Sequence, residues 1–342
     1  MMAGFVIACV IGGHIADKRG KILILAIGSS LMCLGAGLFS IAPSFNWTII
    51  ASLLTGIGGG FSEGMSMAVV SDNTSEKNRT LALNISQIVF CAGAVGTPTA
   101  VGVLISHGIL WRWAYAGASI ACAAAFVLAF IAYKIVVEKH LTQSQESHIP
   151  LKSIIRSPLV IALSVSLMIY VGAECGFANW IAVYFKEQLS AGASYSANMV
   201  AMFWGGIAVG RGLTAVTSRY MSNEAIVVWA FLSGAIFLGI TLLIHIILPA
   251  SALVFFAGVA YGPSWPTILS VAGERFKNQT GSVFGVIVAS GSIGAMIFPA
   301  VVGISSDITS LRVALWVCPA ISLVGAAIFL RLWKDKRRTA IE

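Results

Sequence analysis

The sequence predicts an all-α protein that crosses a membrane many times, on the evidence of its composition, its apolar runs and its basic residues. Of 342 residues, 58% are hydrophobic and 10% are charged, and the mean hydropathy is +0.92. A soluble domain carries about 25% charged residues, so this chain has too little polar surface for a water-soluble fold. The apolar runs are long and lack strand-type alternation. A backbone inside a bilayer must satisfy its own hydrogen bonds, which helices and closed barrels both do, and runs of this kind favour helices over a barrel.

Eleven apolar runs are expected to be membrane-spanning helices. A helix needs about 20 mostly apolar residues to cross the ~30 Å hydrocarbon core, and most of the runs reach that length. In chain order they are 1–15, 22–41, 47–70, 80–105, 113–133, 158–185, 195–218, 225–247, 252–272, 280–305 and 312–331.

The Lys and Arg residues fall mainly on one of the two sides that eleven alternating spans define. That side receives eighteen of the 21, and the other receives only Arg112, Lys186 and Arg312. An excess of Lys and Arg marks the cytoplasmic side of a membrane protein. We therefore expect a multi-pass protein of the plasma (cytoplasmic) membrane with its C-terminus in the cytoplasm. The net charge of +8 then reflects topology, and no nucleic-acid partner is expected.

Neither a catalytic centre nor a cofactor site is expected. The six cysteines all lie inside apolar runs and have neither metal-ligand nor disulfide-framework spacing. A buried cysteine behaves as a small apolar side chain. The sequence offers no nucleophile–base pairing, metal cluster or phosphate-binding glycine loop. We expect no enzyme activity, no metal and no cofactor.

The longest polar stretch divides the chain into an N-terminal helical bundle at 1–133, a cytoplasmic linker at 134–157 and a C-terminal six-helix bundle at 158–342. A shift of 202 positions places Gly60–Glu63 on Gly262–Trp265, which indicates an internal repeat. Five spans against six leave the first bundle one helix short, so eleven of twelve helices are expected here. We expect the natural gene to encode another ~30–70 residues upstream, enough for that helix.

The loop after the first run carries a recognisable motif. It reads Gly13-His14-Ile15-Ala16-Asp17-Lys18-Arg19-Gly20-Lys21, which resembles the GxxxD(R/K)xG(R/K) signature of the major facilitator superfamily. The resemblance implies a fold of two helical bundles with a binding site between them near mid-membrane. It also implies a breakable clasp against a neighbouring helix end, formed by Asp17, Lys18, Arg19 and Lys21. The alternative is ordinary solvated loop charge.

Further segments are similar to the fucose–galactose–glucose:proton symporter branch of that superfamily. The similar segments are GIGGGFSE at Gly56–Glu63, LNISQ at Leu83–Gln87, YVGAECGFANW at Tyr170–Trp180, FWGGIAVGR at Phe203–Arg211, YGPSWPTILS at Tyr261–Ser270 and GSVFGVIVASGSIG at Gly281–Gly294. They run over nearly the whole chain. Each glycine-rich segment alone is a weak signal.

Two acidic residues lie well inside apolar runs, where a charge costs at least ~2.5–3.5 kcal/mol. Glu63 matches the acid that the branch uses for proton and sugar coupling, so we expect it to carry the proton. A neutral acid hydrogen-bonded between helices is the alternative. Glu174 is expected to form a gating or structural pair with Arg211 on the next helix.

A sugar presents polar edges and apolar faces, so its site combines amides with aromatic rings. Residues of both kinds lie in the similar segments, although some of the aromatic ones could instead face lipid. The expected substrate ligands are Gln87, Asn179, Trp180, Trp204, Tyr261 and Trp265.

The resemblance implies proton-coupled uptake of a sugar, a hexose or deoxyhexose, by alternating access in a monomer embedded in the lipid bilayer. Two alternatives stay open. One is export of an apolar or cationic compound, and the other is a membrane sensor or scaffold that transports nothing.

Overall fold

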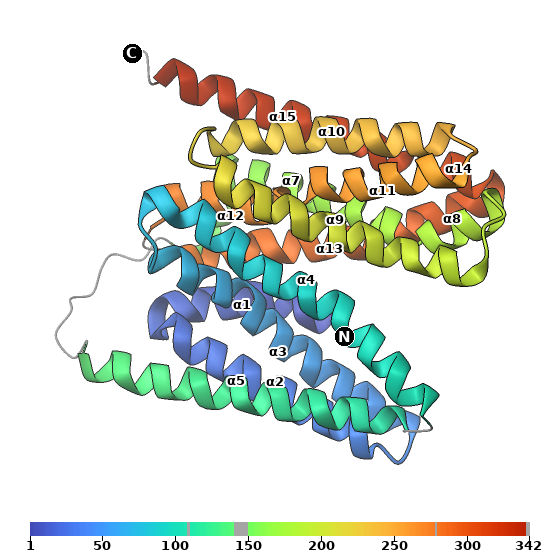
Figure 1. Cartoon of the computed structure of the whole chain (residues 1–342). Helices are drawn as coiled ribbons and strands as arrows, with labels where there is room; N and C mark the ends of the chain where they lie inside the picture. The colour runs from blue at the N-terminus through green and yellow to red at the C-terminus, as the bar shows by residue number, and fades with distance from the viewer. Residues whose placement is uncertain (108–109, 140–149, 278, 340–342) are drawn as a thin grey trace. The chain divides into compact units, whose positions relative to one another are not determined.

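The computed structural model describes residues 1–107, 110–139, 150–277 and 279–339, and these residues form helices with no strand among them (Figure 1). The predicted all-α class is therefore confirmed. The helices are α1 (Met2–Arg19), α2 (Lys21–Ile41), α3 (Phe45–Asp72), α4 (Glu76–Ser106), α5 (Trp111–Lys139), α6 (Leu151–Arg156), α7 (Pro158–Ala178), α8 (Ile181–Gln188), α9 (Ala193–Thr217), α10 (Asn223–Leu243), α11 (Ile247–Tyr261), α12 (Ser264–Arg275), α13 (Thr280–Ile308), α14 (Leu311–Ala314) and α15 (Val317–Thr339).

Nine helical segments in the described part of the chain are long and apolar enough to cross a membrane. Two of the eleven predicted spans are helical but are not among these nine, and they correspond to α1 and α3. The 18 residues of α1 include Asp17, Lys18 and Arg19, and α3 carries Glu63 among many small residues, which lowers the hydropathy of both.

Three predicted spans each consist of two consecutive helices. The run 158–185 is broken between α7 and α8 at Asn179 and Trp180, and 312–331 is broken between α14 and α15. The run 252–272 is broken between α11 and α12, where Gly262 precedes Pro263. Proline has no N–H to donate and its ring clashes with the preceding turn, so this break follows directly from the sequence.

The chain forms two compact units, and the first contains Met1–Asn73, Gly96–Ile161 and Ala272–Ala289. Within it α2 packs against α3 and α5, and α1 packs against α3 (Figure 1). The backbones of α2 and α3 approach closely at Gly28 and Gly58, where an added Cβ would meet main-chain atoms of the other helix. Small residues allow such contacts between membrane helices.

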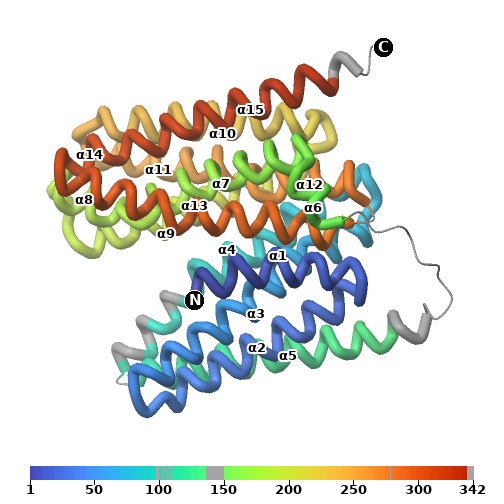
Figure 2. The backbone as a smooth tube through the Cα atoms, turned by 180° about the vertical axis from the view of Figure 1, so that it is seen from behind, coloured from blue at the N-terminus to red at the C-terminus, as the bar shows by residue number. Residues whose placement is uncertain are grey.

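The second unit contains Thr74–Val95, Ala162–Val271 and Ser290–Glu342. In this unit α9 packs against α11, and α10 lies beside α15 in both views of the chain (Figures 1 and 2). Glycines bring the α9 and α11 backbones together: a Cβ at Gly206 or Gly210 would overlap α11, and one at Gly258 or Gly262 would overlap α9.

The two units do not follow the predicted bundle boundary. The first part of α4 belongs to the second unit, and the first part of α13 belongs to the first unit. The bundle boundaries at 1–133 and 158–342 therefore stay a prediction. Of the predicted linker 134–157, residues 140–149 lie outside the described residues.

Candidate functional site

Asp17 caps the start of α13. Its Oδ1 accepts a hydrogen bond from the backbone N–H of Gly281 at 3.0 Å, and its Oδ2 accepts one from Ser282 at 2.7 Å. These are among the N–H groups that a helix leaves without a partner at its first turn. A carboxylate at this position also interacts favourably with the positive end of the helix dipole. The side chain of Asp17 is 3% exposed, so solvent screens these interactions weakly.

Lys21 and Asp72 complete the contact. The Lys21 ammonium lies 2.6 Å from Asp72 Oδ2 and 3.7 Å from Asp17 Oδ1. The hydroxyl of Thr280 donates to Asp72 Oδ1 at 2.8 Å and contacts Oδ2 at 3.1 Å. Two carboxylates thus hold the beginning of α13 while one ammonium lies between them. We call Asp17, Lys21, Asp72, Thr280, Gly281 and Ser282 the α13 clasp.

The glycines of the sequence motif have separate roles in the α13 clasp. Gly20 follows the last residue of α1 with φ 99°, a left-handed conformation that glycine adopts at no steric cost, and it turns the chain into α2. Gly13 faces Gly281 so closely that a Cβ on Gly13 would overlap the Gly281 carbonyl oxygen. Gly13 therefore lets α13 approach α1 closely enough for Asp17 to cap α13.

The other two basic residues of the motif lie outside the α13 clasp. Lys18 and Arg19 are exposed, and the described part of the chain provides no ion pair for either. Of the four motif residues expected to form the clasp, the structure brings Asp17 and Lys21 together with the start of α13. The arrangement consists of hydrogen bonds and charges at the end of a helix, which can separate without disturbing an apolar core.

Glu63 lies on α3 in the first unit and is half-buried. Its neighbours in sequence are in close contact with other helices: Gly60 meets the α1 backbone, Ser62 lies against Gly28 of α2, and Gly64 lies against Gly285 of α13. Glu63 therefore lies in a part of α3 that contacts three other helices: α1, α2 and α13.

Arg211 is the centre of a buried polar cluster in the second unit. This side chain on α9 is 3% exposed. Its Nη1 donates to the backbone oxygen of Gln87 at 2.8 Å and to the Cys91 sulfur at 2.9 Å, and its Nε donates to the Gly262 oxygen at 3.3 Å. The guanidinium thus joins α4 and α9 to the break between α11 and α12. We call Arg211, Gln87, Cys91 and Gly262 the Arg211 cluster.

Glu174 does not form an ion pair with Arg211 among the described residues, although the two charges interact electrostatically. Its Oε1 instead accepts a hydrogen bond at 2.9 Å from Tyr170, one helical turn earlier. Tyr170 also packs edge-on against Tyr261, with ring centres 6.0 Å apart. Tyr261 is fully buried and shares a 2.6 Å hydrogen bond with Ser322. This series of contacts connects α7, α11 and α15.

The remaining expected ligands have different surroundings. Gln87 is buried, and its backbone oxygen binds Arg211. Asn179 is exposed and donates to the Cys175 oxygen of its own turn at 2.8 Å. Trp180 donates to the Pro299 oxygen at 3.0 Å and packs against Gly303. Trp204 is half-buried and lies beside Phe90.

The first turn of α12 contains polar groups that the described residues leave without hydrogen-bond partners. They are the buried Trp265 Nε1, the Ser264 hydroxyl and the Thr267 hydroxyl. A buried donor without a partner loses about 1–3 kcal/mol. Groups of this kind, next to a helix break, are suited to bind an ordered water or a hydroxyl-bearing ligand.

Sequence reasoning missed several of these partners. Neither Asp72 nor the segment 280–282 at the start of α13 was singled out. Their signals were an acid at the end of a helix and a threonine before an apolar run, which is typical of a helix start. Tyr170 was detectable from its spacing of four residues from Glu174, because residues i and i+4 lie on the same face of a helix. Cys91 offered no signal, since all six cysteines lie in similar apolar surroundings.

Comparison with known families and proteins gives a consistent result. The family model described as Major Facilitator Superfamily matches residues 1–299 and 250–341. The chain is 22% identical over 289 residues to the TsgA protein of Shigella boydii, covering 82% of this chain and 70% of that protein. It is 26% identical over 144 residues to a Helicobacter pylori protein named, provisionally, as a glucose/galactose transporter, covering 42% of this chain and 35% of that protein.

Solved structures with the same fold include two sugar transporters. The chain matches FucP in its outward conformation with a TM-score of 0.79 and 17% identity, over 96% of this chain and 87% of that one. FucP is the Escherichia coli fucose:proton symporter. This chain also matches the proton:xylose symporter XylE, with a TM-score of 0.77 and 17% identity, over 97% of this chain and 84% of that one. At these identities the likeness shows a shared fold.

Proposed function

The chain belongs to the major facilitator superfamily, and on that premise we propose that it takes up a sugar, a hexose or deoxyhexose, together with a proton by alternating access. The protein is a multi-pass membrane transporter by family and fold. The specific substrate and the coupling ion are the proposed part. We also propose that it acts as a monomer in the plasma membrane with its C-terminus in the cytoplasm, because the Lys and Arg residues gather on that side.

The carboxyl group of Glu63 is the proposed proton carrier. An acid on a membrane-spanning helix is retained at a cost, so a role in ion coupling is the expectation for it. Glu63 is half-buried, which leaves it partly accessible, and the glycines around it allow close contacts with α1 and α13. When its protonation state changes, the electrostatic cost of these contacts changes with it.

The observation that carries the sugar assignment is the first turn of α12. Trp265 offers an aromatic face together with a buried N–H that has no protein partner among the described residues. A sugar can stack an apolar C–H face on the ring and accept a hydrogen bond from the indole. Transporter sites commonly lie where a membrane helix is interrupted, and α12 begins directly after the Gly262–Pro263 break. An apolar substrate would leave this N–H unpaired.

Alternating access requires contacts that form in one state and break in another. We propose that the α13 clasp is one of them, because it joins α13 to α1 and α3 through charges and a helix cap. Release of Asp17 from Gly281 and Ser282 would free the start of α13 without exposing a large apolar surface.

Two kinds of flux separate coupling from binding in proteoliposomes containing the full-length protein. Proton-driven accumulation needs both the substrate site and the proton carrier, whereas exchange of labelled for unlabelled sugar needs only the substrate site. Glu63→Gln should lose accumulation and keep exchange. Trp265→Phe, which keeps an aromatic ring and removes the N–H, should weaken both, raising the half-saturating sugar concentration about tenfold.

The controls decide between the alternatives. Trp113→Phe makes the same change at an exposed tryptophan of α5 and should leave both fluxes unchanged. Normal accumulation by Glu63→Gln would remove Glu63 as proton carrier. Flux of apolar cations but not of sugars would favour an exporter, and sugar binding without any flux would favour a sensor.

A further inference from the structure

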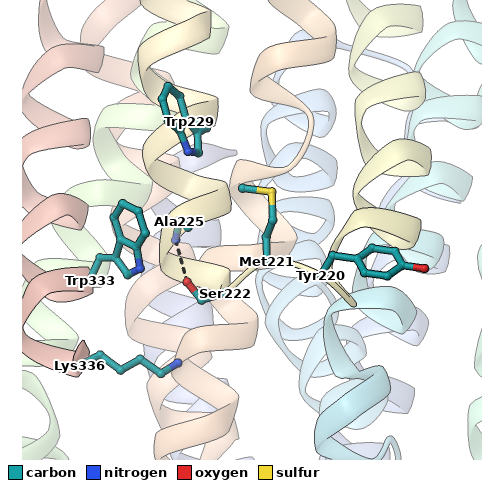
Figure 3. A pocket seen from close by; sticks show the side chains of 7 residues that line it. All are labelled: Tyr220, Met221, Ser222, Ala225, Trp229, Trp333 and Lys336. Carbon is teal, nitrogen blue, oxygen red and sulfur yellow. Dashed lines mark hydrogen bonds between the residues drawn. The ribbon is translucent and has the colours of Figure 1, made fainter. Parts of the chain in front are cut away.

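A pocket of about 420 Å³ lies between α10 and α15, away from the residues discussed so far. Its walls include Ser222, Ala225 and Trp229 at the beginning of α10, and Trp333 and Lys336 near the end of α15. Figure 3 shows Trp333 beside Ala225 and Ser222, with Trp229 further along α10 and Lys336 at the opposite end. The volume falls within the range of small-molecule sites.

One end of this α10–α15 pocket is charged. Lys336 donates to both carboxylate oxygens of Glu224, at 2.8 and 3.1 Å. Glu224 is buried beneath the pocket, with 5% of its side chain exposed, whereas 38% of the Lys336 side chain is exposed. The ammonium therefore faces both the buried acid and the outside of the protein, while the acid faces inward.

The other end of the pocket is apolar and continues along an exposed side of α10. Trp229, Ile236 and Leu243 are 57%, 56% and 64% exposed, and they are spaced seven residues apart, which places them on one helix face. Because α10 is one of the segments able to cross a membrane, such a stripe faces lipid chains. Trp229 lies seven residues beyond Ser222, about 10 Å along the helix axis.

The surrounding sequence is strongly basic. The segment 331–338 carries five Lys or Arg residues and a single acid, Asp335. It extends from the end of the last membrane-spanning segment, where basic clusters interact with the anionic surface of the membrane. Anions near this end of the protein are therefore attracted to it.

We propose that the α10–α15 pocket binds one anionic phospholipid, with its phosphate at Lys336 and an acyl chain along Trp229, Ile236 and Leu243. The order of chemistry along the pocket supports this ligand: a cation at the membrane surface, two tryptophans at the level where indole rings favour the interface, and then an apolar stripe. A free anion would use only the first of these features, and an apolar ligand only the last. The lipid would link the start of α10 to the end of α15.

The pocket can be tested by native mass spectrometry of the purified full-length protein titrated with phosphatidylglycerol, phosphatidylcholine or glycerol 3-phosphate. Wild type should retain one phosphatidylglycerol with about fivefold preference over phosphatidylcholine, since one basic residue near the membrane surface contributes about that factor. Glycerol 3-phosphate should not compete. Binding of glycerol 3-phosphate as tight as that of the lipid would overturn the proposal in favour of a phosphate site.

Three variants separate the pocket from the basic tail. Glu224→Gln removes the acid that competes for Lys336 and should increase the preference for phosphatidylglycerol over phosphatidylcholine. Glu224→Gln with Lys336→Gln removes both charges, leaves no buried unpaired acid, and should reduce the preference to about onefold. Lys334→Gln removes one charge from the exposed side of the same helix and should leave the preference unchanged. Equal losses in the double variant and in Lys334→Gln would show that the tail binds lipid without the pocket.

Discussion

The α13 clasp and the Arg211 cluster both hold a charged side chain against the main chain of another helix, but with opposite chemistry. In the α13 clasp, carboxylates accept hydrogen bonds from the N–H groups and the hydroxyl at the start of α13, and an ammonium lies between the two acids. In the Arg211 cluster, a cation donates to two carbonyl oxygens and a thiol. No carboxylate of the described residues lies within ion-pair distance of it.

Because of this difference, the α13 clasp is suited to opening and the Arg211 cluster is suited to permanent contact. Asp17 is as buried as Arg211, but Asp72 and Lys21 retain 26% and 17% side-chain exposure, so water can replace the protein partners at that part of the α13 clasp. Arg211 is almost fully buried, and separating it from its oxygens would leave a desolvated cation without compensation. We therefore expect the α13 clasp to govern conformation and the Arg211 cluster to govern stability.

The largest effect is expected from Arg211→Met, which keeps the reach of the side chain and removes every donor. Three acceptors then lose a charged partner in a buried site, which should lower stability by about 3–5 kcal/mol. Thermal unfolding of the purified protein should show a decrease in Tm of about 5–10 °C. Arg219→Met makes the same change at an exposed position after α9 and should leave Tm unchanged. Equal Tm values for the two variants would remove the stabilising role.

An intermediate effect is expected from Asp17→Asn, on conformation more than on Tm. The substitution removes a charged helix cap worth about 1 kcal/mol, so α13 should separate from α1 about five times more often. The main-chain carbonyl of Cys9 on α1 lies against Gly285 of α13, and the residue is buried, so labelling of its thiol should report this separation. In a variant with Cys9 as its sole cysteine, the rate of maleimide labelling should rise about fivefold.

Asp307→Asn is the matched control for this labelling, because Asp307 is an exposed acid near the other end of α13. It should leave Cys9 labelling unchanged. If Asp17→Asn also has no effect on labelling while transport continues, the motif is reduced to solvated loop charge.

The smallest effect is expected at Cys91. Cys91→Ala removes one of three acceptors from Arg211 and should lower Tm by about 2 °C, corresponding to about 1 kcal/mol. Cys91→Ser restores an acceptor of similar size and should recover most of that loss. Cys122→Ala, on α5 in the other unit, should match wild type. A larger loss for serine than for alanine would mean that burying a hydroxyl in the apolar surroundings of Cys91 costs more than its hydrogen bond to Arg211 contributes.

The sequence predicted the helices well because apolar length is a local property. The eleven apolar runs coincide largely with helix, but the breaks inside 158–185, 252–272 and 312–331 were missed, and the run 225–247 extends past the end of α10 at Leu243. Pro263 signalled one of these breaks directly. The break at Asn179 and Trp180 has no proline, and instead Trp180 contacts the distant Pro299. A contact of that kind is set by packing and has no local signature.

The candidate site was less predictable because many of its partners are backbone atoms. Asp17 was identified from its motif, but its partners are N–H groups 264 and 265 residues away, which any amino acid except proline would supply. Arg211 was expected to pair with Glu174, whereas it binds the carbonyl oxygens of Gln87 and Gly262. Side-chain chemistry identifies a charge that needs a partner, but carbonyl oxygens are the same in every residue.

The contact between α9 and α11 also determines where this chain is free to vary during evolution. Gly205 and Gly206 are neighbours in sequence, yet a Cβ on Gly205 would enter open space, whereas one on Gly206 would collide with the carbonyl oxygen of Phe255. Alanine at 205 would even favour the helix, by about 1 kcal/mol. Drift can therefore replace the first glycine in a single step, while the second is accessible only to lineages in which α11 has already moved away.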